Sequence, residues 1–194
     1  LSVAMLIGTT FAWFTDTAST GINKIQAGNL DVKLMYSTDM VTWKEATDQT
    51  KLFNDNALWE PGYTQVVYLK VVNAGNLALK YETGFSKNYT SNRGKNVNGD
   101  WYRVDNYLKI GTAETETKFA NREAVWAAVA ATEKTLSKDV MLTDGWVTLE
   151  AGKASKPFAV AIYMPTSVGN EANASRLRPS SVSGLGIEVR ATQA

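Results

Sequence analysis

The sequence predicts an all-β fold, a β-sandwich with one short helix and an extended strand at its N-terminal end. Three observations favour this class: many short segments alternate apolar and polar residues, clusters of Gly, Asn and Pro separate them, and a single segment has helical spacing. A chain of 194 residues is long enough for one domain with a sizeable core. We therefore expect one sandwich domain over residues 15–194, preceded by an apolar strand over residues 1–14.

The first fourteen residues, LSVAMLIGTTFAWF, place most of their large side chains on alternate positions. Successive side chains of an extended chain point to opposite faces, so this pattern predicts a strand with one bulky face and one small face. Leu6 and Thr9 depart from the alternation. The bulky positions are Leu1, Val3, Met5, Ile7, Phe11 and Trp13, and the small positions are Ser2, Ala4, Gly8, Thr10 and Ala12.

Such a strand must bury its bulky face against a folded domain. The pattern allows two possibilities, the chain's own domain and a neighbouring copy. Fourteen extended residues span about 45 Å, which is enough to cross a compact domain of roughly 40 Å. Burying six large side chains at about 1.5–3 kcal/mol each contributes about 9–18 kcal/mol before ordering costs. Another interpretation is the remnant of a secretory signal, with Thr10, Phe11 and Ala12 as a cleavage site.

The next elements follow in order from turn signals. A polar stretch, Thr15 to Gln26, precedes Ala27-Gly28-Asn29, which opens a predicted strand. The residues expected to share one face of that strand are Leu30, Val32 and Leu34. The later turn signals are Ser37-Thr38-Asp39, a hairpin tip leading to Val41 and Trp43, and Trp59-Glu60-Pro61-Gly62, a β-turn whose proline pre-sets the backbone.

The run from Gln65 to Val72 is apolar on both parities, which is typical of a central strand covered on two faces. Asn73-Ala74-Gly75-Asn76 then predicts a hairpin turn into a strand carrying Leu77, Leu79 and Tyr81. From Asn88 to Asp100 the chain is polar and rich in Asn and Gly, so we expect a long exposed loop there.

One helix is predicted from Arg122 to about Lys134. Asn121 is a suitable N-cap, and Val125, Val129 and Trp126 recur at helical spacing among alanines, so the helix is expected to lie against the sandwich. Strand patterns then resume over 146–149, 158–164 and 185–191.

Composition excludes several classes of function. The 20 basic and 19 acidic residues are spread without runs, which gives no footprint for nucleic acid or an anionic membrane. Histidine and cysteine are absent, so His-based triads, thiol nucleophiles, disulfides and the usual zinc or copper sites cannot be assembled. We expect no cofactor, no metal and no small-molecule substrate.

Two oxygen-based sites remain as alternatives. Paired carboxylates hydrolyse glycosides, and Asp55, Glu60 and Glu171 lie in or beside predicted loops. Asn54-Asp55-Asn56 offers oxygens to calcium, but it lacks a repeated acidic spacing and is typical of a solvated turn. We assign neither a catalytic nor a metal site.

The six tryptophans and eight tyrosines are compatible with a carbohydrate-binding face, although aromatic residues of all-β proteins mostly pack in the core. Asn88 and Asn173 each begin an N-glycosylation acceptor pattern, Asn88-Tyr89-Thr90 and Asn173-Ala174-Ser175, which makes them possible glycosylation sites.

Short motifs at both ends of the chain and in its first half follow one another in an order that resembles that of a known family. The apolar start runs into Trp13-Phe14-Thr15-Asp16, and Val189-Arg190-Ala191-Thr192-Gln193 closes the chain. Between them stand Ala27-Gly28-Asn29-Leu30-Asp31, Glu60-Pro61-Gly62 and Asn73-Ala74-Gly75-Asn76-Leu77. In this order the chain resembles the TasA and camelysin family of secreted biofilm-matrix fibre proteins, and it is similar to the archaeal bundling pilins.

The resemblance implies a jelly-roll domain that is exported, processed by a dedicated signal peptidase, and polymerised outside the cell by inserting an N-terminal donor strand into the next subunit. In many bacterial members cleavage falls near the residue equivalent to Ala12, and the donor would then begin at Trp13. Camelysins have been described as metalloproteases, but a chain without histidine or cysteine lacks the conventional zinc ligands, so that activity is not carried over.

The sequence therefore predicts a secreted, non-enzymatic structural subunit of an extracellular homopolymer, a biofilm matrix fibre or pilus. Identical subunits are the expected partners, joined head to tail through Leu1, Val3, Met5, Ile7, Phe11 and Trp13. One alternative is a monomeric cell-surface carbohydrate-binding or adhesive module whose apolar start folds back into its own sheet. A further alternative is a camelysin-like protease or a glycosidase.

Overall fold

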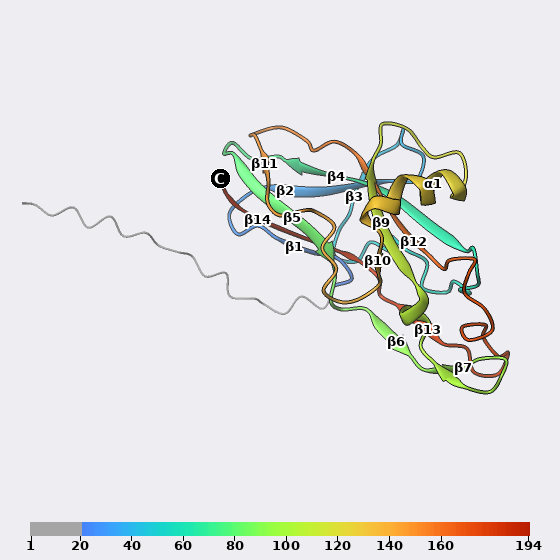
Figure 1. Cartoon of the computed structure of the whole chain (residues 1–194). Helices are drawn as coiled ribbons and strands as arrows, with labels where there is room; N and C mark the ends of the chain where they lie inside the picture. The colour runs from blue at the N-terminus through green and yellow to red at the C-terminus, as the bar shows by residue number, and fades with distance from the viewer. Residues whose placement is uncertain (1–20) are drawn as a thin grey trace, which may run out of the picture.

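The computed structural model describes residues 21–194, and within them two β-sheets pack face to face as an all-β sandwich (Figure 1). This confirms the predicted fold class with its one short helix. The predicted N-terminal strand lies outside the described residues. The first sheet has the order β1-β14-β5-β11, with bounds Lys24–Gln26, Ile187–Gln193, Leu79–Phe85 and Val147–Leu149.

The second sheet has six strands in the order β10-β9-β12-β4-β2-β3. Its pairings are all antiparallel, whereas β1 pairs with β14 in parallel in the first sheet. The chain passes repeatedly from one sheet to the other, as it does in a jelly roll. The bounds are Lys134–Thr135 for β10, Lys109–Glu114 for β9, Phe158–Tyr163 for β12, Thr64–Asn73 for β4, Val32–Ser37 for β2 and Lys44–Glu45 for β3.

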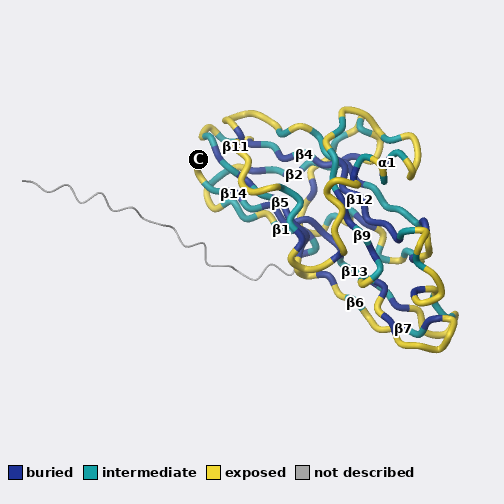
Figure 2. Tube along the Cα trace, in the orientation of Figure 1, coloured by how far each residue is buried: buried dark blue, intermediate teal, exposed yellow. Residues whose placement is uncertain are grey.

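Inward-facing side chains of both sheets form the core. Figure 2 colours stretches of the strands in both sheets as buried. Val32 and Leu34 share the inward face of β2 as the alternation predicts, whereas Leu77, expected in the strand with Leu79 and Tyr81, is 51% exposed and precedes β5. Fully buried members from the two sheets are Leu34, Leu69, Val71, Val160, Ile162, Leu79, Phe85, Ile187 and Val189.

The predicted helix is confirmed with small changes at its end. α1 (Arg122–Val129) begins after Asn121, whose side-chain oxygen accepts a hydrogen bond from the Ala124 N–H at 2.9 Å. A 3-10 turn, η2 (Ala130–Thr132), continues it. Val125 and Val129 are buried against the outer face of β12, so the helix covers the second sheet from outside.

The hairpin predicted at residues 73–76 is wrong. β4 belongs to the six-stranded sheet and β5 to the four-stranded one, so this turn carries the chain across the sandwich instead of pairing the two strands. The Asn73 amide stabilises the crossing by donating to the carbonyls of Leu77, Leu149 and Glu150, while its oxygen accepts from the Gly75 N–H.

The segment predicted as a long exposed loop over residues 88–100 is mostly exposed, but it contains two short strands instead of being a loop throughout. This segment contributes to an extension at one end of the sandwich, opposite the end occupied by the C-terminus in Figure 1. Tyr89, Gly94 and Asn96 are buried in it. The extension comprises residues 86–107 and 165–184. It contains β6 (Thr90–Asn92) paired with β13 (Ser181–Ser183), β7 (Gly94–Lys95) paired with β8 (Trp101–Tyr102), and η1 (Val104–Tyr107).

Candidate functional site

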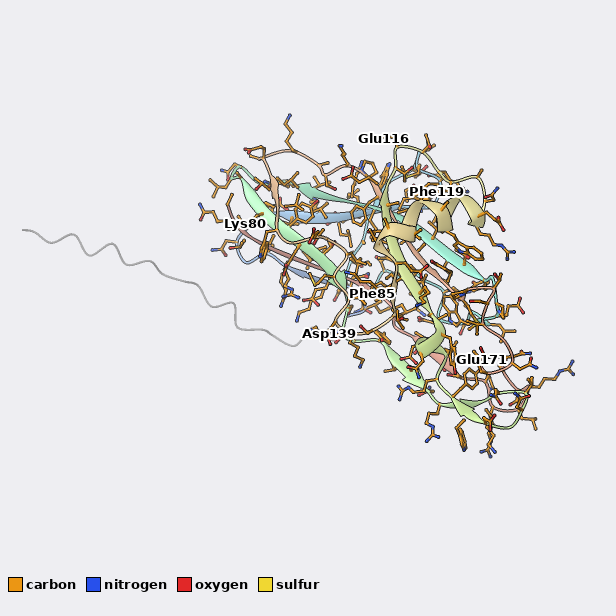
Figure 3. All side chains as sticks on the ribbon, in the orientation of Figure 1. Lys80, Phe85, Glu116, Phe119, Asp139 and Glu171 are labelled. Atoms are coloured by element: carbon orange, nitrogen blue, oxygen red, sulfur yellow. The ribbon has the colours of Figure 1, made fainter. Side chains whose placement is uncertain are left out.

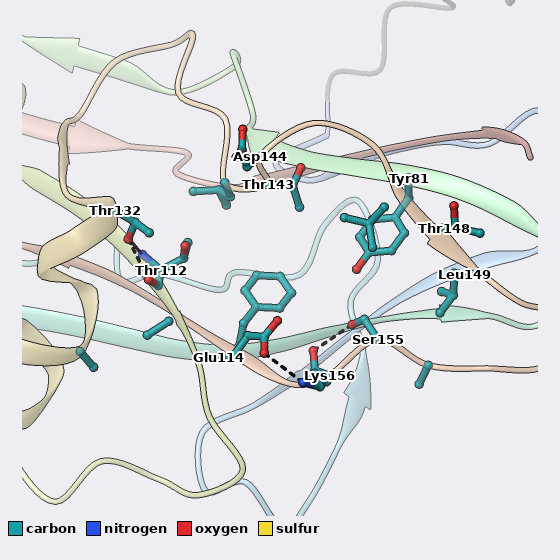
Figure 4. A pocket seen from close by; sticks show the side chains of 16 residues that line it. Tyr81, Thr112, Glu114, Thr132, Thr143, Asp144, Thr148, Leu149, Ser155 and Lys156 are labelled. Carbon is teal, nitrogen blue, oxygen red and sulfur yellow. Dashed lines mark hydrogen bonds and ion pairs between the residues drawn. The ribbon is translucent and has the colours of Figure 1, made fainter.

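A cleft of about 840 Å³ lies between the two sheets along one side of the sandwich (Figure 4). Its walls come from β9 and β12 of the six-stranded sheet, from β5 and β11 of the other sheet, from α1 and η2, and from the segments before β11 and β12. The side chains that line it include Tyr81, Thr112, Glu114, Val147 and Phe158.

At the cleft, the interior of the sandwich is accessible to solvent. Thr112 pairs with Val160 and Glu114 with Phe158 across the β9–β12 ladder, so all four side chains point to the inner face. Val160 is fully buried, Thr112 and Phe158 are half-buried, and Glu114 is exposed. The core therefore thins out along β9 toward its end.

The facing sheet shows the same opening. Val147 of β11 is the cross-strand partner of Tyr81 of β5, so both face the interior, yet Val147 is 38% exposed. Burial raises the pKa of Tyr81 above its ordinary value of 10, while a hydrogen bond with Ser155 acts in the opposite direction. The cleft floor is thus an apolar core surface reached from solvent.

Two sheet edges border the cleft. β10 pairs only with Lys109 and Ile110, so within the described residues Gly111–Glu114 have no strand on the side away from β12. β11 is the last strand of its sheet and has β5 on one side alone. Exposed strand edges offer backbone donors and acceptors to an added strand.

Side chains partly cover this free edge. The Thr132 hydroxyl accepts from the Thr112 N–H at 2.8 Å and donates to the Thr112 carbonyl at 2.7 Å. At the mouth of the cleft Lys156 and Glu114 form an exposed ion pair at 3.5 Å, which Figure 4 marks with a dashed line. Such an exposed pair opposes strand entry only weakly, because solvent screens it.

The predicted carboxylates do not lie in this cleft. Asp55 pairs with Lys51 at 3.3 Å and accepts from the Gly184 N–H. Glu171 lies on the extension (Figure 3), where the Gly169 N–H hydrogen bond lowers its pKa and favours the charged form. Glu60 is exposed in the turn before β4. Among residues 21–194 no group of three or more acidic, His or Cys side chains is placed to hold a metal.

The other predicted sites have separate positions. The donor residues Leu1, Val3, Met5, Ile7, Phe11 and Trp13 lie outside the described residues. Asn88 and Asn173 are both exposed, and the Asn88 amide donates to the Gly21 carbonyl at 2.9 Å. In the described part of the chain, no helix combines the length and the apolar character required to cross a bilayer.

The cleft itself was not identified by the sequence interpretation. Its residues come from five segments between Tyr81 and Phe158, and local patterns mark each of them only as strand, helix or turn. Phe158 and Glu114 are opposite each other only in the folded β9–β12 ladder, so the local sequence offers no signal for this opening.

No protein-family model and no curated protein matches this chain. Among solved structures, part of the chain is similar to a family 123 glycoside hydrolase from Clostridium perfringens whose structural analysis concerns glycolipid glycan hydrolysis. The identity is 14%, the TM-score is 0.23, and the match covers 68% of this chain and 21% of that one. A similarity this low assigns neither an activity nor a family to the chain.

Proposed function

We propose that this protein is a structural subunit of an extracellular homopolymer, in which the N-terminal segment of one copy fills the cleft between β9 and β11 of the next. The observation that supports the proposal is an open side of the sandwich, lined by both apolar and polar residues, where no described strand pairs with the edge of β9 over Gly111–Glu114. An alternating apolar strand has the side-chain pattern that such a site requires.

The dimensions are compatible. The part of the β9 edge without a paired strand, Gly111–Glu114, extends about 13 Å, so four or five residues of the segment 1–14 would lie along it. An added strand would have to displace the Thr132 hydroxyl from the Thr112 N–H and carbonyl. Strand residues of one parity then enter the cleft beside Phe158 and Val147, while the other parity faces outward.

The positions of the two contact regions favour a chain of subunits. β1, which follows the N-terminal segment, is at one edge of the four-stranded sheet, and β11 is at the opposite edge. Donor and acceptor are therefore different surfaces, and a head-to-tail contact between different surfaces builds an open polymer when its rotation does not close a ring.

Removing residues 1–13 tests the donor, and Val147→Asp tests the acceptor by placing a charge in the cleft wall. Both variants are expected to remain folded and monomeric in analytical ultracentrifugation and electron microscopy. Val41→Asp is the matched control, because Val41 is 83% exposed and lies outside the cleft lining; it should polymerise like the unmodified chain. Fibres of undiminished length from either test variant would contradict the proposal.

A further inference from the structure

The extension carries an aromatic side chain surrounded by positive charge. Trp101 of β8 is 50% exposed. The Arg93 guanidinium carbon lies 5.0 Å from its ring centroid, the Lys95 Nζ lies 5.1 Å away, and the Arg178 guanidinium carbon lies 6.0 Å away. We call these four residues the tryptophan patch.

The patch is held on one outer face by the backbone of the extension. Lys95 and Trp101 are cross-strand partners, so their side chains share a face, whereas Tyr102 is buried on the opposite face. The Lys95 N–H donates to the Arg178 carbonyl at 2.8 Å, which fixes the loop bearing Arg178 next to β7. Lys95 and Arg178 are therefore placed by hydrogen-bonded backbone.

These cations are not neutralised within the described chain. Arg93, Lys95 and Arg178 form no ion pair with a described carboxylate, in contrast to Arg103, which pairs with Asp105 at 3.7 Å. Three positive charges around one half-exposed ring attract a negatively charged ligand that also presents a surface to an aromatic face.

The extension is basic while the rest of the chain is acidic. Its two segments, 86–107 and 165–184, contain six Lys or Arg and three Asp or Glu. Because the whole chain has 20 basic and 19 acidic residues, the remainder has 14 basic and 16 acidic residues. The charges of the whole chain nearly cancel, so the composition does not reveal that the extension is locally positive.

We infer that the tryptophan patch binds an acidic polysaccharide of the polyuronate class. A uronic acid bears its carboxylate directly on the sugar ring, so a sugar that contacts the exposed half of Trp101 places that carboxylate within reach of the cations that lie over the indole. Repetition of this unit along the polymer supplies further carboxylates to Arg178. The patch belongs to the extension and not to the cleft, so this binding does not require polymerisation.

The test measures binding of the full chain to alginate by isothermal titration calorimetry, with neutral dextran as the uncharged comparison. Trp101→Ala is expected to lower alginate affinity about tenfold, a loss typical of an aromatic contact at the centre of a site. Arg178→Gln is expected to weaken binding and to reduce its dependence on salt. Trp146→Ala, at a tryptophan that is 48% exposed elsewhere, and Lys153→Gln should bind like the unmodified chain.

Three results would overturn the inference: unchanged alginate affinity of a Trp101→Ala variant, equal binding of dextran, or binding of phosphatidylglycerol vesicles in preference to alginate. Repeating the titration with Val147→Asp separates this inference from the proposed function. If the monomeric variant still binds alginate, the patch is supported as a site independent of polymerisation. If the variant loses both polymerisation and alginate binding, that independence is contradicted.

Discussion

Asn23 is the residue whose replacement should most clearly weaken the base of the proposed donor segment. Its side chain is fully buried, and it connects three parts of the chain through hydrogen bonds. The amide donates to the Thr47 carbonyl at 2.9 Å and to the Thr50 carbonyl at 2.7 Å, and its oxygen accepts from the Ile187 N–H at 3.0 Å. In a fibre, tension on the donor would pass through this connection into β14.

The expected cost of Asn23→Ala follows from these bonds. Each contributes about 1 kcal/mol net, so losing three lowers the free energy of unfolding by about 3 kcal/mol. For a domain of this size that corresponds to roughly 6–12 °C in Tm. Urea unfolding followed by tryptophan fluorescence measures the change, and the midpoint should fall while the slope stays constant.

A matched replacement separates this effect from the general effect of removing an amide. Asn98 is exposed in the β7–β8 turn, so Asn98→Ala should change the free energy of unfolding by less than about 0.5 kcal/mol. The reasoning is refuted if Asn23→Ala costs less than about 1 kcal/mol, or if the two variants are equally stable.

Two further predictions concern backbone packing and acid titration. Gly186→Ala would place a Cβ 1.9 Å from the Ile22 carbonyl oxygen, so thermal unfolding should show that the free energy of unfolding falls by about 1–3 kcal/mol. Gly75→Ala, where the added Cβ would make only ordinary contacts, should lower the free energy of unfolding far less. Equal losses for the two variants would contradict this explanation. Hydrogen bonds from the Thr42 and Val41 N–H groups lower the pKa of Asp39 to about 2 from 3.8. The order of this turn should therefore be complete above pH 3.8 and decline as the pH falls through 2, and NMR titration with a midpoint near 3.8 would contradict it.

The sequence predicts those elements whose local pattern agrees with their tertiary environment. β4 is apolar on both parities because the core covers one face and the α1 side the other, and its central place in the sheet follows. α1 begins directly after Asn121 because an asparagine oxygen satisfies a free N–H at a helix start. Both patterns are contained within a few consecutive residues.

The elements missed by sequence interpretation depend on distant contacts. β7 lies in a polar segment, but Gly94 has no side chain and passes so close to Ser180 that an added Cβ would lie 2.1 Å from the Ser180 nitrogen. The tryptophans illustrate the same limit. Trp59 is buried as expected of a core aromatic, whereas Trp101 and Trp146 are about half exposed. Their exposure depends on which strands lie beside them, which no local pattern records.

Engineered cysteines test the central claim most directly, because the chain contains no cysteine of its own. One set of chains carries a single cysteine at Val3, Met5 or Ile7, and a second chain carries Thr112→Cys in the cleft wall. Mixing the two under oxidising conditions should give disulfide-linked dimers on non-reducing gels for at least one donor position. The same donors mixed with Val41→Cys should give no comparable product. Internally linked monomers from a chain carrying both cysteines, without dimers from any mixture, would contradict exchange of the strand between copies.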